Sequence, residues 1–343
     1  MERSSSGRFQ ELDVLRGLAA LSVVFFHYSF HGTRYFDNYP FFFWPGEFGV
    51  HLFFVISGFV IYYTIERCRT VGDFLFSRFS RLYPAYWVAL GLLFVWAVLD
   101  PSQRVWWRAY LVNVTMFQKF VGFPDVDNVY WTLGVELVFY AVMTLVFLAG
   151  QMQRVVLVSA LWLAAGAAWG SVHHFSPNED HSIGNTYFIL PYAPYFVAGM
   201  MFYLIYSRGR RLPYVLTIAL AAAALWVIQG PRVFWITLVI FGLFALAVGG
   251  WLRFLVNPLT LWLGAISYPL YLVHREPGYA FLDWMNAHGQ SHWLTFGLAT
   301  GAALVAGHLL SVGVERPAMR ALRRGYRARG GHAQPVPYTS AGT

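Results

Sequence analysis

The chain has 343 residues, of which 58% are apolar and 12% charged, about half the charged fraction of an ordinary soluble domain. The apolar residues occur in runs long enough to cross a bilayer as helices, and the alternating segments of a membrane β-barrel are absent. The net charge of +8 is spread over short loops between these runs, which argues against a nucleic-acid-binding domain. We therefore predict an all-α integral membrane protein.

About ten transmembrane helices are predicted, with both termini in the cytoplasm. This orientation puts roughly three quarters of the 24 lysines and arginines on the inner side, as the positive-inside rule requires. The chain then divides into a cytoplasmic segment (1–11), a ten-helix membrane domain (12–313) and a basic cytoplasmic tail (314–343) that is disordered at its end, with no separate soluble domain. The predicted spans are 12–30, 48–66, 82–99, 130–149, 155–172, 188–206, 214–229, 233–250, 259–277 and 293–313.

Two outer segments do not fit a spanning helix. Residues 104–121 are aromatic and apolar but carry three positive charges, so we expect an interfacial or re-entrant helix there. The polar loop 173–187, which contains Glu179, Asp180 and three histidines, fits a solvated loop or a metal site. We assign no metal ligands, and the lone Cys68 excludes an internal disulfide and a cysteine-based metal site.

The first predicted helix carries ionisable side chains at membrane depth. Arg16 lies near its start and His27 near its end, which places them about 16 Å apart along the axis and within about 20° of one face. Ionisable groups in such a segment usually face a protein interior and mark function. An arginine bound to lipid phosphates and a hydrogen-bonded core histidine explain the same residues. This helix by itself leaves both interpretations open.

Arg78 and Arg81 precede the third predicted span. Three residues apart, they share a helical face, and two guanidinium forks held together match the oxygens of a phosphate. Positive-inside topology with lipid headgroup contact also accounts for them. In the second span, Ser57 lies among small residues that permit close helix packing. Its hydroxyl can alternatively donate a hydrogen bond to a bound carbonyl.

Glu136 lies inside the fourth predicted span, with Thr132 and Tyr140 four residues away on the same face. A carboxyl group at this depth is costly unless it is protonated or paired. Glu136 is therefore either a functional group, with Arg16 or His27 as its partner, or half of a structural ion pair. At the end of the ninth span, the run His274-Arg275-Glu276 could bind a polar acceptor or simply terminate the helix.

Taken in order along nearly the whole chain, these stretches resemble acyltransferase family 3, the integral-membrane O-acyltransferases. His51 stands where many members carry Asp, so we assign that position no role. The motifs that carry the resemblance are LDVLRGLAALSVVFFH with its Arg-x10-His spacing, GVHLFFVISGF, the Arg-x2-Arg pair in FSRFSRLYPAYW, WTLGVELVFY, ISYPLYLVH-x-x-P and the closing VERP.

The resemblance implies a ten-helix enzyme that takes an acyl group, commonly acetyl, from acyl-CoA at the cytoplasmic face. The acceptor it implies is a hydroxyl, usually on a sugar of an envelope polysaccharide or glycolipid and sometimes on a small secondary metabolite. It also implies that His27 is the essential catalytic residue and that Arg16, Arg78 and Arg81 serve the acyl donor.

Our hypothesis makes His27 the general base, with Glu136 orienting or charge-balancing its imidazole. Acyl-CoA is expected as co-substrate, with no permanently bound cofactor. Membrane lipids and a carbohydrate or glycolipid acceptor are the expected partners, nucleic acid is not, and the expected location is the inner (plasma) membrane. Residues assigned to acceptor contact or support are Ser57, Trp131, Tyr140 and His274.

Three alternatives stay open. The acceptor could be a small metabolite such as a macrolide, and transfer could be direct or pass through an acyl-histidine. Buried His, Glu and Arg in a helix bundle also fit a proton-coupled transporter. The cytoplasmic arginine pair, and the lack of the inverted repeat that many transporters show, favour the enzyme.

Overall fold

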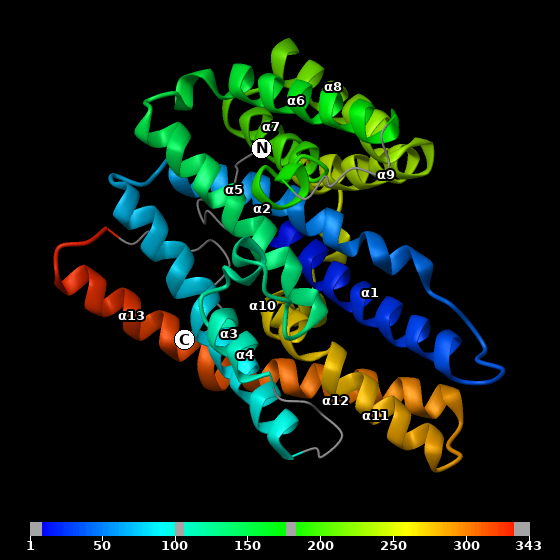
Figure 1. Cartoon of the computed structure of the whole chain (residues 1–343). Helices are drawn as coiled ribbons and strands as arrows, with labels where there is room; N and C mark the ends of the chain where they lie inside the picture. The colour runs from blue at the N-terminus through cyan, green and yellow to red at the C-terminus, as the bar shows by residue number, and fades with distance from the viewer. Residues whose placement is uncertain (1–8, 100–105, 176–182, 333–343) are drawn as a thin grey trace. The chain divides into compact units, whose positions relative to one another are not determined.

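The computed structural model describes residues 9–99, 106–175 and 183–332. Within these ranges the chain forms helices and no strand, which confirms the all-α class (Figure 1). Four predicted features lie wholly or partly outside them: residues 1–8 of the N-terminal segment, the start of segment 104–121, Glu179 and Asp180 of the polar loop, and the tail after residue 332.

The α-helices, and the short 3₁₀- or π-helical segments labelled η, run in this order: α1 (Gln10–Tyr35), η1 (Trp44–Phe48), α2 (Gly49–Ile65), α3 (Val71–Leu99), α4 (Trp107–Asn113), η2 (Gln118–Val121), η3 (Asn128–Tyr130), α5 (Trp131–Leu148), η4 (Met152–Arg154), α6 (Val155–Phe175), η5 (Ile183–Tyr187), α7 (Ala193–Arg208), α8 (Leu212–Gln229), α9 (Pro231–Val248), η6 (Arg253–Leu255), α10 (Pro258–Val273), α11 (Arg275–Ala287), α12 (His292–Leu310), η7 (Ser311–Glu315) and α13 (Arg316–Ala328).

A helix lies at each of the ten predicted spans. In the described part of the chain, eight helical segments are long and apolar enough to cross a membrane. The other two positions hold α7 and α10, each 16 residues long. At about 1.5 Å per residue they reach about 24 Å, which is less than a typical hydrocarbon core of about 30 Å.

The start of α3 corrects the predicted third span. The helix begins at Val71 rather than at residue 82, so Arg78 and Arg81 lie inside it and Pro84 is internal. A capping box explains the early start: the Thr70 hydroxyl accepts from the backbone N–H of Asp73, and the Asp73 carboxylate accepts from the backbone N–H of Thr70, both at 3.1 Å. The Thr-x-x-Asp pattern was the missed signal.

Three further segments differ from the predictions. The described part of segment 104–121 is helical in two pieces, because α4 ends at Asn113 and the short η2 follows as a separate turn; whether it is interfacial or re-entrant stays a prediction. The predicted end of the ninth span divides at His274 into α10 and the additional helix α11. The predicted tail begins with helix α13, which carries Pro at its start and has an apolar side that buries Met319.

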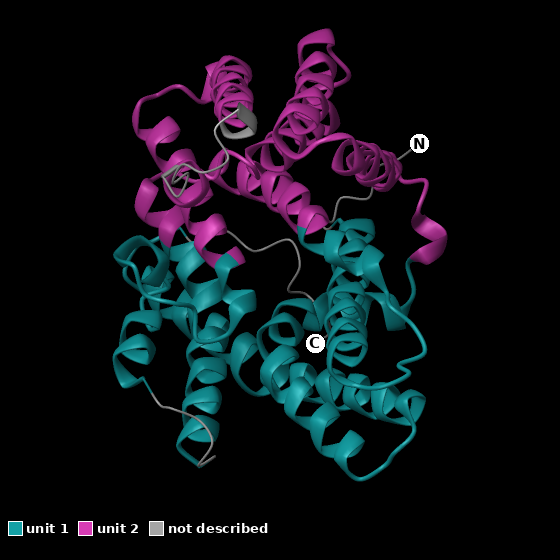
Figure 2. Ribbon diagram, turned by 45° about the vertical axis from the view of Figure 1, so that its right-hand side comes forward, with its two compact units in different colours: residues 1–50, 76–131, 256–343 teal, residues 51–75, 132–255 magenta. Residues whose placement is uncertain are grey.

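The chain forms two compact units from interleaved segments (Figure 2). Unit 1 comprises residues 1–50, 76–131 and 256–343. Its centre is the contact of α1 with α10, where two glycines let the backbones approach closely. A Cβ atom on Gly17 would lie 2.6 Å from the nitrogen of Gly264, and one on Gly264 would lie 2.2 Å from the carbonyl oxygen of Asp13. Larger side chains at these positions would force the helices apart.

Unit 2 comprises residues 51–75 and 132–255. Here α2 and α7 approach closely, since a Cβ atom on Gly58 would lie 2.1 Å from the carbonyl oxygen of Phe196. A Cβ atom on Gly199 would lie 2.0 Å from that of Val55. The small residues of the second predicted span therefore include one that packs helices together.

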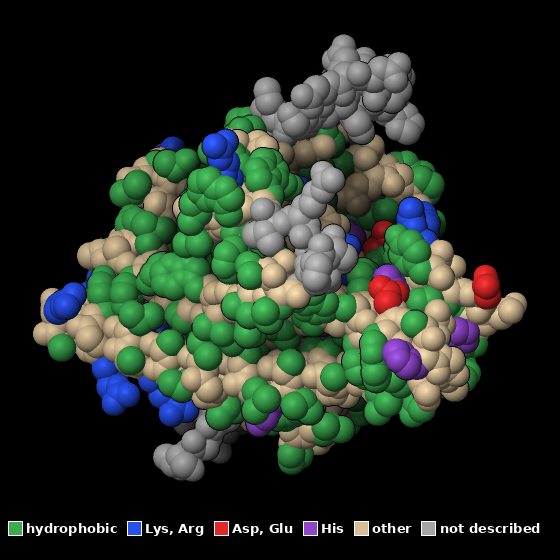
Figure 3. Space-filling view, turned by 60° about the horizontal axis from the view of Figure 1, so that its bottom comes forward, with side chains coloured by type: hydrophobic (Ala, Val, Ile, Leu, Met, Phe, Trp, Pro, Cys, Tyr) green, Lys and Arg blue, Asp and Glu red, His purple; other side chains and the backbone are tan. Residues whose placement is uncertain are grey.

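Large apolar side chains are exposed along the long helices, including Leu92 and Val95 of α3 and Trp235 and Val239 of α9. Hydrophobic side chains also cover much of the face seen in Figure 3. A water-soluble monomer rarely exposes apolar surface this extensively, whereas a bilayer favours it. Together with the apolar helices, this surface identifies a multi-pass membrane protein.

Candidate active site

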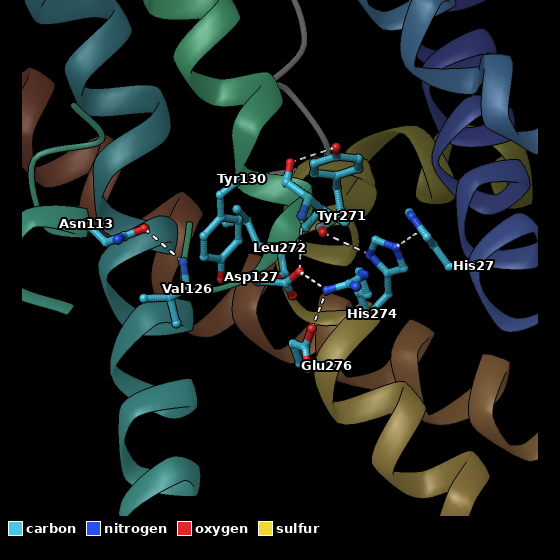
Figure 4. A network of polar contacts seen from close by, with 11 residues as sticks. His27, Asn113, Val126, Asp127, Tyr130, Tyr271, Leu272, His274 and Glu276 are labelled. Atoms are coloured by element: carbon cyan, nitrogen blue, oxygen red, sulfur yellow. Dashed lines mark hydrogen bonds and ion pairs between the residues drawn. The ribbon is translucent and has the colours of Figure 1, made fainter. Parts of the chain in front are cut away.

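The site in unit 1 is centred on two histidines that are 247 positions apart in the sequence (Figure 4). His27 lies in the last third of α1, and His274 joins α10 to α11. Contact of α1 with α10 brings His27 Nδ1 to 2.9 Å from His274 Nε2. The His274 side chain is fully buried, whereas His27 is partly accessible. The structure thus gives His27 a partner that the sequence had placed only among the supporting residues.

The hydrogen bonds of His274 determine which nitrogen of His27 is free. His274 Nδ1 lies 2.9 Å from the carbonyl oxygen of Tyr271, which can only accept, so this nitrogen carries a proton. In a neutral His274, Nε2 is then an acceptor and His27 Nδ1 must be the donor. His27 Nε2 is left with an unprotonated lone pair, which is what a general base requires.

Tyrosine hydroxyls donate to backbone carbonyls at the end of helix α10 and so hold the backbone around His274 in place. Tyr28 donates to the carbonyl of His274 at 2.8 Å, and Tyr130 donates to that of Leu272 at 3.2 Å. Tyr271 in turn donates to the carbonyl of Val129 at 3.0 Å. These bonds tie the end of α10 to α1 and to η3, which precedes α5, and so fix the backbone that carries His274.

The buried carboxylate of Asp127 binds Arg275, the residue that follows His274. The buried Asp127 accepts from Arg275 at 3.2 Å and from the backbone N–H of Val129 at 3.1 Å. Arg275 also pairs with Glu276. Burial, with a smaller effect of Glu276, raises the pKa of Asp127 to about 6. The ion pair with Asp127 therefore fixes Arg275, the residue next to His274. Asp127 takes up a proton as the pH falls below about 6. Nothing in the sequence pattern had singled out Asp127.

The predicted donor-binding arginines are all in unit 1 and largely buried. Arg16 donates to the Ser267 hydroxyl at 3.2 Å and lies 3.8 Å from Asp13, and Arg78 donates to the Ser77 hydroxyl at 2.9 Å. The charges of Arg16 and Arg78 both act on Arg81. The three arginines therefore lie near one another in unit 1, and their role towards the donor stays a prediction.

Arg81 is also paired, in an ion pair with the buried Glu315. Glu315 belongs to the closing VERP motif, and its other carboxylate oxygen accepts from Ser311 at 3.1 Å. Because one carboxylate already neutralises Arg81, this arginine is less available to an anionic ligand than its spacing suggested. The acidic residue in VERP was visible in the sequence, but its partner was not.

Glu136 has its own polar cluster within unit 2. Its carboxylate accepts from Tyr140 at 2.5 Å and from Ser57 at 3.1 Å. Two of the predicted supporting residues therefore bind the predicted carboxylate itself. Trp131, the first residue of α5, is half-buried and belongs to unit 1. His27 and Glu136 lie in different units, and the role of Glu136 towards His27 stays a prediction.

Among the described residues, no group of three or more His, Cys, Asp or Glu side chains could hold a metal ion. The arrangement around His27 offers acid–base chemistry: a lone pair that can accept a proton, and a hydrogen-bonded partner that orients the ring.

Comparison with known proteins gives this chemistry a context. The family model described as an acyltransferase domain matches residues 9–312. The exopolysaccharide production protein ExoZ of Rhizobium meliloti is 30% identical over 250 residues, which cover 67% of this chain and 75% of ExoZ. Acyltransferase MdmB of Streptomyces mycarofaciens is 26% identical over 325 residues, 81% of this chain and 82% of MdmB.

A third similar protein is the peptidoglycan O-acetyltransferase OatA of Listeria monocytogenes, which is 26% identical over 153 residues. The match covers 38% of this chain and 23% of OatA. No solved structure matches the chain.

Proposed function

Since this chain belongs to the acyltransferase-domain family and is a membrane acyltransferase, we propose that it acetylates a hydroxyl of an envelope or exported polysaccharide or glycolipid, with cytoplasmic acetyl-CoA as donor. Family membership favours the enzyme over the transporter. The name of ExoZ refers to exopolysaccharide production, and that of OatA to O-acetylation of peptidoglycan. Both names support a carbohydrate acceptor.

The observation that carries the mechanism is the hydrogen bond from His27 to His274. His27 Nε2 removes the proton from the acceptor hydroxyl, and the oxygen attacks the thioester carbonyl carbon. The tetrahedral intermediate collapses, the C–S bond breaks, and the imidazolium returns its proton to the departing thiolate. The products are the O-acyl ester and CoA. The bond to His274 holds the ring in the tautomer that makes this possible.

The donor lies with its phosphates towards Arg16 and Arg78. About 16 Å of helix α1 separates Arg16 from His27 along the axis. The pantetheine arm of CoA is a long, flexible chain that suits this separation, with the phosphates at the arginines and the thioester near the histidine. Since Lys and Arg favour the cytoplasmic side, the arginine end of α1 is the cytoplasmic end.

His27→Ala tests the base. We expect transfer of radiolabelled acetyl from acetyl-CoA to polysaccharide to fall at least about 100-fold, the usual contribution of general acid–base catalysis. His31→Ala is the matched control, because His31 lies one turn further along α1 and pairs with Asp283 at 2.7 Å instead of His274. Wild-type transfer by a folded His27→Ala protein would exclude the base role.

The same label distinguishes direct transfer, which we propose, from an acyl-histidine route. Direct transfer predicts no label on the protein when acetyl-CoA is supplied without acceptor.

Polysaccharide and a macrolide, offered as competing acceptors, test the acceptor class. Glu136→Gln should lower turnover; a fall in thermal stability alone would make its cluster structural.

A further inference from the structure

A fourth arginine lies close to the predicted donor arginines, and it comes from the C-terminal end of the chain. Arg323 of α13 is 94% buried, as is Arg78 of α3, since each retains only 6% of its exposure. The charges of Arg16, Arg78 and Arg323 all act on Arg81, and the charge of Arg78 also acts on Arg323. All four residues belong to unit 1.

Helix α13 packs against α3, and these contacts fix the position of Arg323. The rings of Phe76 and Tyr326 stack with centroids 4.0 Å apart and planes 10° from parallel. Arg323 Nε donates to the Ser80 hydroxyl at 3.3 Å, and Ser80 donates to the carbonyl of Ser77 at 3.2 Å. Arg78 donates to the Ser77 hydroxyl, so both arginines are held by the same turn of α3.

Together, these four arginines carry more positive charge than the acidic residues around them neutralise. Of the described acidic residues, Asp13 lies beside Arg16 and Glu315 pairs with Arg81. No described carboxylate forms a salt bridge with Arg78 or Arg323, and in each a buried guanidinium nitrogen, Nε of Arg78 and Nη2 of Arg323, has no hydrogen-bond partner among the described residues. Buried charge of one sign is unfavourable unless a counter-charge arrives from outside the chain.

We infer that Arg78 and Arg323 form a binding site for a phosphate group of the acyl donor, and that the C-terminal helix α13 is therefore part of the donor site. Guanidinium groups are the side chains that best match phosphate oxygens, and here two of them bind the same turn of α3, each with one unsatisfied donor. This assignment depends on the proposed function in one respect only, namely that the phosphate group belongs to CoA. A lipid headgroup offers the same chemistry, so the test separates the two sources.

The test compares Arg323→Gln with Arg320→Gln, an exposed arginine on the same helix. Loss of a charge-assisted bond to phosphate should raise the KM for acetyl-CoA about tenfold or more in Arg323→Gln and leave Arg320→Gln unchanged. The KM for acetyl-pantetheine, which lacks the CoA phosphates, should not respond. Arg323→Lys keeps the charge and should recover part of the affinity, which separates lost binding from misfolding.

Two results would overturn the inference. One is an equal change with both donors, which indicates a structural effect. The other is an unchanged KM for acetyl-CoA, whether or not Arg323→Gln weakens binding to phosphatidylglycerol vesicles; weaker vesicle binding would identify a lipid phosphate site instead. Titration of the inactive His27→Ala protein with CoA measures the phosphate site without turnover, so failure of the proposed reaction and failure of this site give different results.

Discussion

His274 shows what one contact adds to the interpretation of a residue. Arg-x10-His spacing singled out His27 but said nothing of its second nitrogen. Because the carbonyl of Tyr271 can only accept, His274 Nδ1 carries a proton, and the bond to His27 then defines which nitrogen of the His27 ring is free. We therefore propose that His274 is a positioning residue, which acts through His27 rather than on the substrate.

Substitution of His274 tests that role. His274→Leu removes the acceptor for His27 Nδ1–H, so the ring can adopt the unproductive tautomer, and we expect kcat to fall about 100-fold with the KM for acetyl-CoA unchanged. His274→Gln can accept that proton and donate to the Tyr271 carbonyl, so it should retain a substantial part of the activity. A purely structural role predicts similar losses for both variants, matched by their thermal unfolding.

Asp127 gives the site a dependence on pH. Burial raises its pKa from the ordinary 3.8 to about 6, so the folded state holds this proton more tightly than the unfolded chain. Its contribution to the free energy of unfolding should therefore decrease as pH rises from about 4 to about 6 and be constant above that range. We expect the slope of stability against pH in this window to be more negative for wild type than for Asp127→Asn, measured by thermal unfolding in detergent. Identical slopes would contradict the raised pKa.

At the scale of helices, the contact of α1 with α10 decides where His27 lies. The two helices approach at Gly17 and Gly264, and ten residues further along each of them His27 meets His274. Periodicity predicted both helices, but the close approach depends on the absence of a side chain at both positions. The histidine pair is therefore a consequence of helix packing.

Gly264→Ala should disturb this contact. The added Cβ would lie 2.2 Å from the Asp13 carbonyl oxygen, so we expect the protein to lose about 1–3 kcal/mol and transfer activity to decrease. Gly301→Ala in α12 is the matched control: apart from the adjacent residues and the backbone of its own helix, no described atom lies within 4 Å of its added Cβ, and alanine is favoured over glycine in a helix. Thermal unfolding should move in opposite directions in the two variants, and equal stabilities would argue against close packing at Gly264.

At the scale of the whole molecule, chain order and spatial order differ. Unit 1 is assembled from three separated stretches, so its site combines residues from the first helix, the region around residue 127 and the last third of the chain. The cytoplasmic placement of both chain ends rests on charge distribution alone. Sidedness therefore needs its own test.

Single cysteines introduced into a Cys68→Ser background test sidedness. A membrane-impermeant maleimide should label Gln290→Cys, between α11 and α12, in intact spheroplasts, whereas Arg320→Cys in α13 should react only after permeabilisation. Both positions are exposed in the structure. The reverse pattern would invert the topology and move the donor arginines to the outer side.

The sequence by itself determined the membrane class, a helix at each of the ten predicted spans and the residues that deserved mutation, because apolar runs and the cost of buried charge are local properties. It missed the start of α3, where the Thr70–Asp73 capping box extends the helix beyond the apolar run. It also missed helices α11 and α13, whose polar and charged residues give no long apolar run. Only the tertiary structure decided the distant partners: His274 for His27, Glu315 for Arg81 and Ser57 for Glu136. The physical reason is distance along the chain, since no local periodicity records which residues, often hundreds of positions apart, helix packing brings into hydrogen-bond range.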